Sequence, residues 1–444
     1  MNVMSKFRFS STLLIALLMS VMSIGNVNAT VVEIDGVCYD DSGFGIGDGE
    51  AIISSINQGT IPAEVVIPEK VTINGKECVV TRIHRSAFAY NTIVTSVTLP
   101  AGLKYIDNYA FSQCTNLAEV KGIPEKLDYM GHAVFNNTKW LSSLKDSAPE
   151  GLYLVGGWVI GYVGDIPETL IFPNNTIGIC DNFAIRINYT NYSYVKNIVL
   201  NEGLKYINYD AFEYFLGLTE INLPASLEVV ENEAFDCCAN IKQFTVAAGN
   251  NYFSAVDGIL YNKEQTKLIL YPNGKTDTEV VVGNNVTELA EYAFYGAYYI
   301  KSLTIPEGVT EIPSQAIRAM NSLETVILPS TVNYFGFGIF VQCSSLKSII
   351  LYAEETPEYS GEDLSLLTET TLYVPEVSLD VYKTHDTWGK MGNIKTIELY
   401  TGVENVGIDK SSIDNTIYNL KGQRICSPQK GQIYINNGKK YIQR

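Results

Sequence analysis

The most constraining feature of the sequence is a unit of 23 residues that recurs along most of the 444-residue chain. The stretch Leu204–Pro224 shows the unit. Its anchor is a small residue followed by an apolar one, Ala211-Phe212, with aliphatic residues at fixed positions on both sides and a proline at the end. Because stacked repeats bury a core between neighbours, a chain too long for one compact core can still fold.

The small anchor residue, taken as position zero, recurs nine times. Four spacings are 23 residues and one is 24, whereas the others are 50, 27 and 59. Apolar residues stand seven and four positions before every anchor, and we interpret Cys180 at position −4 as a small buried hydrophobe. This regularity predicts a repeat solenoid. The anchors are Ala87, Ala110, Val134, Ala184, Ala211, Ala234, Ala293, Ala316 and Ile339.

Each unit contains a short stretch with the alternation of a β-strand. Glu220–Leu223 and Leu303–Ile305 alternate between polar or small and aliphatic residues, and the proline that follows ends the strand because it cannot donate to a ladder. Strands of successive units should stack about 4.8 Å apart. The predicted fold class is therefore a mainly β solenoid.

Two long spacings between anchors predict insertions, at about 145–170 and about 250–275. The first has two apolar runs about Gly156-Gly157, and the second has a turn at Asp257-Gly258. Both patterns indicate β-hairpins that leave the stack and return to it. They could carry function, as loops on rigid scaffolds often do, or simply cover the convex side.

The two ends of the chain do not fit the repeat. Apolar runs about Asn74-Gly75 predict a hairpin within an N-terminal β cap, and Leu379–Trp388 predicts a short helical stretch in a closing segment, 352–400. Beyond it, alternating runs predict strands at Ile417–Leu420, Gln423–Cys426, Gln432–Ile435 and Lys440–Ile442. The expected divisions are a signal peptide (1–29), a cap (30–79), the solenoid (80–400) and a small β module (401–444).

The N-terminus has the pattern of a secretory signal peptide. Lys6 and Arg8 precede the apolar run Leu13–Val21, and small residues lead to Ala29, after which we expect cleavage. The apolar run is shorter than a membrane span of about 20 residues, and none follows later. We therefore expect export without a transmembrane segment.

The charge is negative, −17 overall and −25 over residues 30–409. An acidic surface repels phosphate backbones, which argues against nucleic acid as a partner. It could recruit a basic partner, or it could simply keep a secreted protein soluble.

The unit L-x-x-I-x-x-x-A-F-x-x-C-x-x-L-x-x-V-x-L-P resembles the leucine-rich repeat of BspA-like, Treponema-type surface proteins of Bacteroidetes, and Leu103–Pro124 has it almost complete. The resemblance covers about 60–390. It implies a right-handed leucine-rich-repeat solenoid on a protein that is secreted or exposed on the outer surface of a Gram-negative bacterium. The family is associated with adhesion to host proteins and other cells. The end of the chain, Ile417–Gly438, resembles the C-terminal sorting tails of secreted Bacteroidetes proteins.

Catalytic and metal-binding motifs do not stand out. The chain has three histidines and no His-Glu-x-x-His or Cys-x-x-Cys, so we expect no enzyme, no metal and no cofactor. A pair of carboxylates hidden on one face remains an alternative. Cys114 and Cys238 share position +4 of distant units, so they cannot pair, and we interpret them as interior ladder residues. Cys38 and Cys78 in the cap are a candidate disulfide.

Clustered tyrosines are the best candidate for a binding site. Tyrosine offers a flat apolar face with a polar tip, which suits recognition of proteins or glycans, although these residues could also pack as ordinary solenoid surface. Outward strand residues add an apolar patch near the C-terminal end. We expect a monomer that binds a protein, or alternatively a glycan. The candidate residues are Tyr189, Tyr192, Tyr194, Tyr206, Tyr209, Tyr214, Asn222, Tyr295, Tyr298, Ile327 and Ile350.

Overall fold

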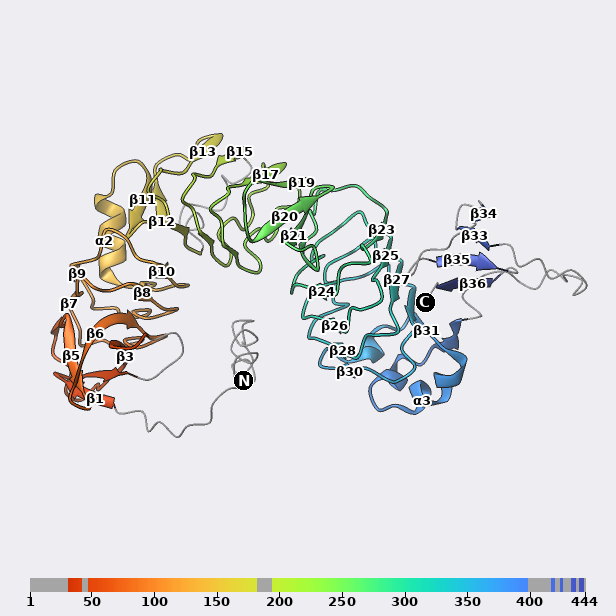
Figure 1. The fold of residues 1–444 in the computed structure, drawn as a ribbon, viewed down its shortest axis with the longest axis horizontal. Coiled ribbons are helices and arrows are strands. Elements are labelled where there is room, and N and C mark those ends of the chain that lie inside the picture. The colour runs from red at the N-terminus through yellow and green to blue at the C-terminus, as the bar shows by residue number, and fades with distance from the viewer. Residues whose placement is uncertain are drawn as a thin grey trace, which may run out of the picture.

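The computed structural model describes residues 31–41, 47–181 and 194–397, and four strands between 417 and 442. Successive units stack side by side and curve into an arc (Figure 1). The predicted mainly β solenoid is confirmed. The expected signal peptide and the anchor Ala184 lie outside the described residues.

Each unit contributes one short strand to the inner side of the arc (Figure 1). Neighbouring inner strands pair in parallel, for example β8 with β10 through Ile106 and Met130. The inner strands are β8 (Tyr105–Ile106), β10 (Tyr129–Met130), β14 (Gly178–Ile179), β16 (Tyr206–Ile207), β18 (Val229–Val230), β24 (Glu288–Leu289), β26 (Glu311–Ile312), β28 (Tyr334–Phe335) and β30 (Glu358–Tyr359).

A second set of parallel strands follows the outer side (Figure 1). Their inward side chains, such as Ile221 and Leu303, are fully buried. The outer strands are β4 (Glu64–Val66), β7 (Ser96–Thr98), β9 (Glu119–Lys121), β13 (Thr169–Ile171), β15 (Asn197–Val199), β17 (Glu220–Leu223), β19 (Gln243–Val246), β23 (Glu279–Val281), β25 (Ser302–Thr304), β27 (Thr325–Leu328), β29 (Ser348–Leu351), β31 (Thr371–Val374) and β32 (Ile394–Thr396).

A tight corner joins each inner strand to the next outer strand, and the anchor dipeptide sits in it. Alanine at position zero is buried, and the aromatic ring that follows stacks on its counterpart in the next unit. The rings of Phe212 and Phe235 lie 5.3 Å apart and 5° from parallel, and those of Phe111 and Phe135 lie 5.4 Å apart. The repeat positions thus specify stacked, buried rings in neighbouring units where the residue after the anchor is aromatic, whereas Ile317 fills that position in one unit.

Cysteines at position +4 form part of this core. Each buried thiol donates a hydrogen bond to a backbone carbonyl of the preceding unit: Cys114 Sγ to Phe88 O, 2.9 Å, and Cys238 Sγ to Phe212 O, 3.0 Å. Burial raises the pKa of the Cys114 thiol to about 11. The interpretation of these residues as interior ladder positions is confirmed.

The candidate disulfide between Cys38 and Cys78 is wrong, since both cysteines are free. Cys38 lies on β2 (Val37–Asp40) and Cys78 on β6 (Lys76–Ile83). Strand β3 (Glu50–Ile56) lies between them in the sheet. Two strand spacings amount to roughly 10 Å, beyond the 7 Å or so that a disulfide can span.

The cap continues the inner ladder. In its sheet β1 (Val31–Ile34) pairs with β2, β2 with β3, and β3 runs parallel to β6, which pairs with β8. The hairpin expected at Asn74-Gly75 is confirmed, because β5 (Lys70–Ile73) pairs antiparallel with β6 directly across it. The cap therefore covers the first repeat with strands of its own.

The two insertions contain the expected hairpins but do not leave the stack. Strands β11 (Gly151–Val155) and β12 (Trp158–Val163) pair about Gly156-Gly157, and β12 then pairs in parallel with the inner strand β14. Helix α2 (Lys139–Ser147), which the sequence analysis did not predict, precedes them and is capped by Thr138. In the second insertion β20 (Phe253–Val256), β21 (Ile259–Asn262) and β22 (Lys267–Leu270) form a meander, and β22 pairs in parallel with β24.

One repeat register differs from the expected one. Strand β14 places Ile179 opposite Ile207, which stands at position −4 of its unit. Cys180 therefore occupies position −3, although it is buried as expected. One more residue than in other units lies between the inner strand and Ala184. Counting back from the anchor therefore gave Cys180 the wrong repeat position.

The solenoid ends in a compact helical segment. It consists of η2 (Leu364–Leu366), η3 (Glu376–Ser378), α3 (Leu379–Thr384) and η4 (Trp388–Met391), with Tyr382 and Trp388 fully buried. Beyond it β33 (Ile417–Asn419), β34 (Arg424–Ile425), β35 (Ile433–Asn436) and β36 (Lys439–Ile442) form an antiparallel sheet in the order β34-β33-β35-β36. None of the helices in the described part of the chain has the length and apolar character that a membrane crossing requires.

Candidate functional site

The corner after β22 is shorter than a standard corner. In a standard corner four residues separate the second inner-strand residue from the ring that follows the anchor, as between Leu289 and Phe294. Strand β22 pairs Leu268 with Leu289, and Tyr271 N donates to Ala293 O (2.8 Å) just as Phe294 N donates to Ala316 O (2.9 Å). Only two residues, Ile269 and Leu270, therefore separate Leu268 from Tyr271.

The backbones of this short corner and of the full corner before it are not joined. No described backbone hydrogen bond joins residues 231–237 to residues 267–274, and β18 ends its sheet. A cavity of about 30 Å³ lies between the two corners, and we call it the short-corner pocket. It is lined by Val230, Glu231, Asn232, Glu233, Ala234, Phe235, Asp236, Ile269, Leu270, Asn273, Glu291, Tyr292 and Tyr295.

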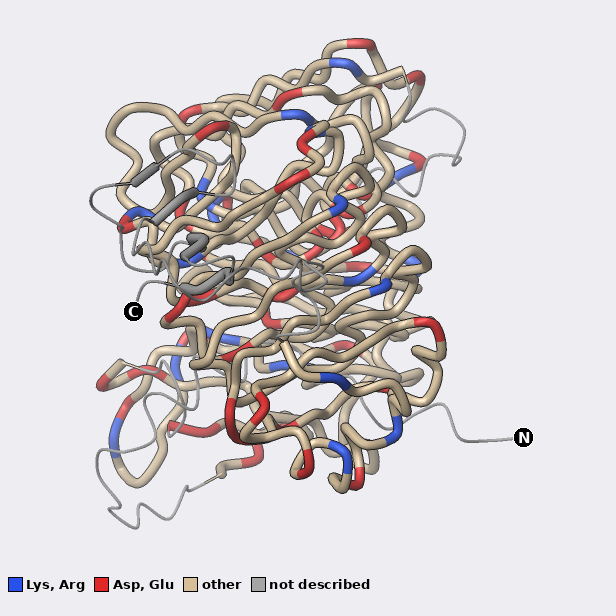
Figure 2. The backbone as a smooth tube through the Cα atoms, turned by 90° about the vertical axis from the view of Figure 1, so that its right-hand side faces the viewer, with Lys and Arg blue, Asp and Glu red and all other residues tan. Residues whose placement is uncertain are grey.

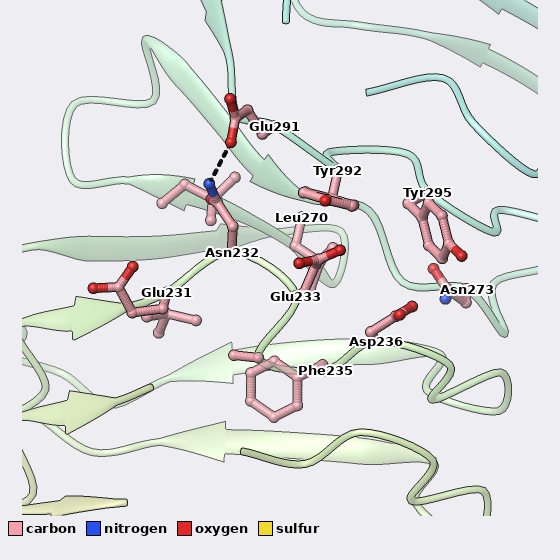
Figure 3. Close-up of a pocket in the computed structure, with 13 residues that line it drawn as sticks. Glu231, Asn232, Glu233, Phe235, Asp236, Leu270, Asn273, Glu291, Tyr292 and Tyr295 are labelled. Atoms are coloured by element: carbon pink, nitrogen blue, oxygen red, sulfur yellow. Dashed lines mark hydrogen bonds between the residues drawn. The ribbon is translucent and has the colours of Figure 1, made fainter. Parts of the chain in front are cut away.

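Polar side chains from three corners meet at this pocket (Figure 3). Glu233 and Asp236 come from the corner after β18, Asn273 follows the short corner, and Tyr292 and Tyr295 come from the corner after β24. The hydroxyl of Tyr292 donates a hydrogen bond to the Glu233 carboxylate. The arrangement brings acceptors and aromatic faces around one small space.

A direct contact spans the short corner. Asn232 Nδ2 donates to Glu291 Oε2 at 3.0 Å, although 59 positions separate the two residues (Figure 3). The two full corners therefore touch across the shorter one, which closes one side of the pocket.

Carboxylates continue along the same flank of the solenoid. Positions −1 and +2 are acidic in two consecutive units, as Asp210 and Glu213 and then as Glu233 and Asp236. None of these four forms an ion pair with a described residue. Figure 2 shows acidic and basic residues interspersed over the rest of the stack. We call these four carboxylates, with Tyr209, Tyr214, Tyr295 and Tyr298, the acidic flank.

The environment disfavours ionisation of these acids. Burial, followed by repulsion from Glu213 and Glu233, raises the pKa of Asp210 to about 8. Burial also raises the pKa of Glu233 and of Asp236. The neutral form is favoured because water is withdrawn while the negative charges remain close together.

One cation approaches the flank without pairing with it. The guanidinium carbon of Arg318 lies 5.9 Å from the ring centroid of Tyr295, and its charge partly offsets the rise in the pKa of Glu233 and Asp236. Its Nη1 donates to Gln315 instead. Its buried Nε has no hydrogen-bond partner among the described residues.

Stability should fall as pH rises through the range in which Asp210 ionises. The folded-state pKa of about 8 lies above the value of about 3.9 expected for the unfolded chain, so the folded state holds the proton more tightly. The loss is absent below about pH 4 and complete above about pH 8. Asp210→Asn should therefore stabilise the protein by about 1 kcal/mol at pH 8, a modest gain because water still screens this partly exposed group, and should change little at pH 4.

Thermal unfolding at pH 4, 6 and 8 measures this effect. The exposed Asp257, replaced in the same way in a hairpin turn, is the matched control. Equal effects of the two substitutions at pH 8 would contradict the assignment to Asp210.

The structure brings together four of the predicted tyrosines. Tyr209 donates a hydrogen bond to Glu233, and Tyr214 is hydrogen-bonded to Cys237, next to Asp236. Repulsion from Asp236 raises the pKa of both Tyr295 and Tyr298, after the larger effect of burial. The tyrosine pattern was visible in the sequence, whereas the carboxylates between the tyrosines were missed. Their signal was the same acidic pair recurring 23 residues later.

Other predicted residues lie elsewhere. Tyr206 is on the inner strand β16, where its ring stacks on Trp158 at 5.4 Å, and Asn222 and Ile327 are on outer strands. Ile350 is only 1% exposed, so its place in an exposed apolar patch is wrong. It lies in the outer sheet between β27 and β31.

Two further candidates fall at the edge of the described part of the chain. Tyr189 and Tyr192 lie outside it, and Tyr194, where the description resumes, is 65% exposed. No group of three or more His, Cys, Asp or Glu side chains in the described part could hold a metal ion.

The fold and its repeat define the leucine-rich-repeat class of solenoid. The chain matches the BspA type leucine rich repeat region in six copies, over residues 66–150, 184–278 and 269–364. These residues make up more than half of the chain, which therefore belongs to the BspA-type leucine-rich-repeat family. The family is typical of the cell surface or of secreted proteins and indicates a role in protein binding or adhesion. A comparison with curated protein sequences gave no match.

Solved structures of bacterial repeat proteins are similar to the chain. The pneumococcal vaccine antigen PcpA is 18% identical, with a TM-score of 0.39, over 83% of this chain and 98% of its own. A leucine-rich repeat protein from Eubacterium ventriosum is 19% identical, with a TM-score of 0.36, over 82% and 83%. A leucine rich cell surface protein from Faecalibacterium prausnitzii is 19% identical, with a TM-score of 0.31, over 75% and 95%.

Proposed function

We propose that this protein is an exported, non-catalytic adhesion or recognition protein that binds a protein partner with a basic surface through the acidic flank. The observation that carries the proposal is the set of four adjacent carboxylates without an ion pair among the described residues. Lysine or arginine side chains of a partner would supply the missing positive charge and form charge-assisted hydrogen bonds. Binding would relieve a repulsion that the isolated chain retains.

The tyrosines of the flank suit the same role. Tyr209 and Tyr214 are 38% and 40% exposed, so their rings keep faces available while their hydroxyls are held by Glu233 and Cys237. Rings fixed in this way lose little conformational entropy when they contact a partner. They add apolar contact area to an interface whose specificity is electrostatic.

The alternatives fit the flank less well. A neutral glycan could stack on tyrosine and donate hydroxyl hydrogen bonds to the carboxylates, but it would bring no positive charge to offset their repulsion. Glycoside hydrolysis needs two carboxyl groups that flank a sugar ring, and a cavity of about 30 Å³ holds only about two water-sized groups. We therefore favour a protein partner, bound by a monomer whose C-terminal strands serve as a sorting module.

The test is made at pH 9, where Asp210 is ionised, and compares two double variants with the same change in net charge. Asp210→Asn with Glu213→Gln removes charge from the flank, whereas Glu64→Gln with Glu279→Gln removes exposed charge from the outer strands β4 and β23. Binding of the purified chain to immobilised poly-L-lysine is measured between 50 and 300 mM salt, with a glycan array in parallel. The flank variant should bind at least about tenfold more weakly, which corresponds to about 1.4 kcal/mol, and the control should bind like the parent.

Equal weakening in both variants would show that only the overall charge matters, and it would remove the flank from the proposal. Binding to neutral glycans that the flank variant retains would favour the carbohydrate alternative.

A further inference from the structure

We infer that the short-corner pocket binds a primary ammonium group, the end of one lysine side chain on the partner protein. This inference rests on the proposed function, because the same flank presents the pocket. It goes further by naming the chemical group that is recognised and the cavity that receives it.

A largely buried polar side chain without a hydrogen-bond partner among the described residues indicates a ligand. Asn273 lines the cavity and is only 7% exposed, yet its carboxamide makes no hydrogen bond to any described residue (Figure 3). Amides of largely buried residues almost always have a partner in the protein or in water, and the Asn273 amide, which is not among the fully enclosed unpaired atoms, is accessible to a group that enters the cavity. Its oxygen is an acceptor at the wall of an acidic pocket, which suits a donor that carries positive charge.

The other walls supply what an ammonium group requires. Glu233 and Asp236 face the cavity from one corner, and Tyr292 and Tyr295 face it from another (Figure 3). An ammonium group has three donors and no acceptor. The two carboxylates and the Asn273 oxygen can accept three hydrogen bonds, and the negative faces of the tyrosine rings attract the charge. Tyr209 and Tyr292 use only part of the accepting capacity of Glu233, and Cys237 N, which donates to Asp236 Oδ1 at 2.6 Å, uses only part of that of Asp236.

The size of the cavity favours lysine over arginine. About 30 Å³ corresponds to two or so water-sized groups, which is room for an ammonium nitrogen and its last methylene. A guanidinium group carries three nitrogens in a rigid plane and would need more room. The apolar residues Leu270 and Phe235 suit the aliphatic part of the lysine stem.

The nearest internal cation does not fill this role. Arg318 is not among the residues that line the cavity, and its guanidinium is engaged by Gln315. A metal ion fits less well, since no described group of three or more acidic, histidine or cysteine side chains is placed to coordinate one. A lysine from outside remains as the cation that matches both charge and shape.

The experiment uses the full chain and small probes. Saturation-transfer NMR is recorded with Nα-acetyl-lysine methylamide, with the same compound acetylated at Nε, and with Nα-acetyl-arginine methylamide. The lysine probe should receive saturation, and the Nε-acetyl probe should lose at least about tenfold in affinity because it lacks the charge. The arginine probe should bind several-fold more weakly than the lysine probe. Equal binding of all three probes would overturn the inference.

Two variants test the pocket directly. Asp236→Asn keeps the shape and removes one charge, and Asn273→Leu fills the cavity with apolar atoms. Each should weaken lysine binding at least fivefold, whereas Glu64→Gln, on the outer strand β4 and outside the flank, should leave it within twofold. Circular dichroism melts establish that each variant is folded. Full lysine binding in both folded pocket variants, or displacement of the lysine probe by stoichiometric Ca²⁺, would contradict the assignment.

The two proposals can fail separately. If poly-L-lysine binding depends on the flank but the lysine probe is not recognised in the cavity, the pocket assignment falls and the proposed function stands. If the flank variant and its control bind poly-L-lysine equally while the lysine probe still depends on Asp236 and Asn273, the pocket is an isolated amine site.

Discussion

Replacing Phe212 by alanine should lower the free energy of unfolding by about 3–5 kcal/mol. The ring is fully buried, lies 5.3 Å from Phe235 in nearly parallel planes, and meets Phe215 edge-on at 5.5 Å. Truncation would leave a cavity in the ladder of rings, and close packing on both sides prevents the neighbouring units from collapsing into it. Urea unfolding followed by far-ultraviolet circular dichroism measures the loss.

Phe337→Ala is the matched control for this substitution. Phe337 is a phenylalanine of the same solenoid but is 54% exposed, so its removal should cost less than about 1 kcal/mol. A comparable loss at the two positions would mean that the ladder of rings does not determine stability in the way its packing indicates.

Replacing Gly178 by alanine should cost about 2–3 kcal/mol. A Cβ atom at this position would lie 2.3 Å from Cε3 of Trp158, whose side chain is fully buried and donates through Nε1 to Leu127 O at 3.2 Å. The indole cannot move away without losing this hydrogen bond and its stacking on Tyr206. The inner ladder would have to shift, and the tryptophan fluorescence should change with it.

Gly59→Ala serves as the comparison. The nearest atom to its added Cβ would be Asn57 Oδ1 at 3.4 Å, an ordinary contact, so stability should change little. If Gly178→Ala left both the unfolding midpoint and the fluorescence unchanged, the close approach of Trp158 would not be a constraint in solution.

The repeat made most of the solenoid predictable. Position zero and the aliphatic positions before it identify buried residues such as Ala211 and Leu204, because a stacked unit must repeat its interior at a fixed period. Hairpins at Gly156-Gly157 and Asp257-Gly258 were predictable from turn chemistry. The repeat could not show that β12 and β22 pair with the inner strands. The spacing of the anchors does not reveal which strand of an insertion lies beside the inner strand of the next unit.

The short corner shows why the site was harder to predict. Leu268, Ile269 and Leu270 are consecutive aliphatic residues, so the sequence does not reveal which one stands opposite Leu289. Only the register of β22 against β24 and the hydrogen bond of Tyr271 establish that two residues are missing. A pocket that forms because a corner is two residues shorter than the standard one has no sequence motif.

The acidic cluster was missed in the sequence for a different reason. Tyr209, Tyr214, Tyr295 and Tyr298 were recognised as a possible surface, but the acidic residues were treated as a general property of the chain. Asp210 and Glu233 occupy the same position of successive units, which places them about 4.8 Å apart along the stack. Comparing equal repeat positions, instead of summing charge, would have identified the cluster.

The missing backbone hydrogen bonds at the short corner also affect how cooperatively the solenoid unfolds. The buried core separates at the same place: Phe253 and Leu260 belong to the cluster before it, and Tyr261 and Leu268 to the cluster after it. In a stack whose units are stabilised by their neighbours, a weak interface lets the segments on either side unfold as separate blocks. A partner lysine bound between the two corners would connect these blocks. Partner binding would then also couple the unfolding of the two halves of the arc.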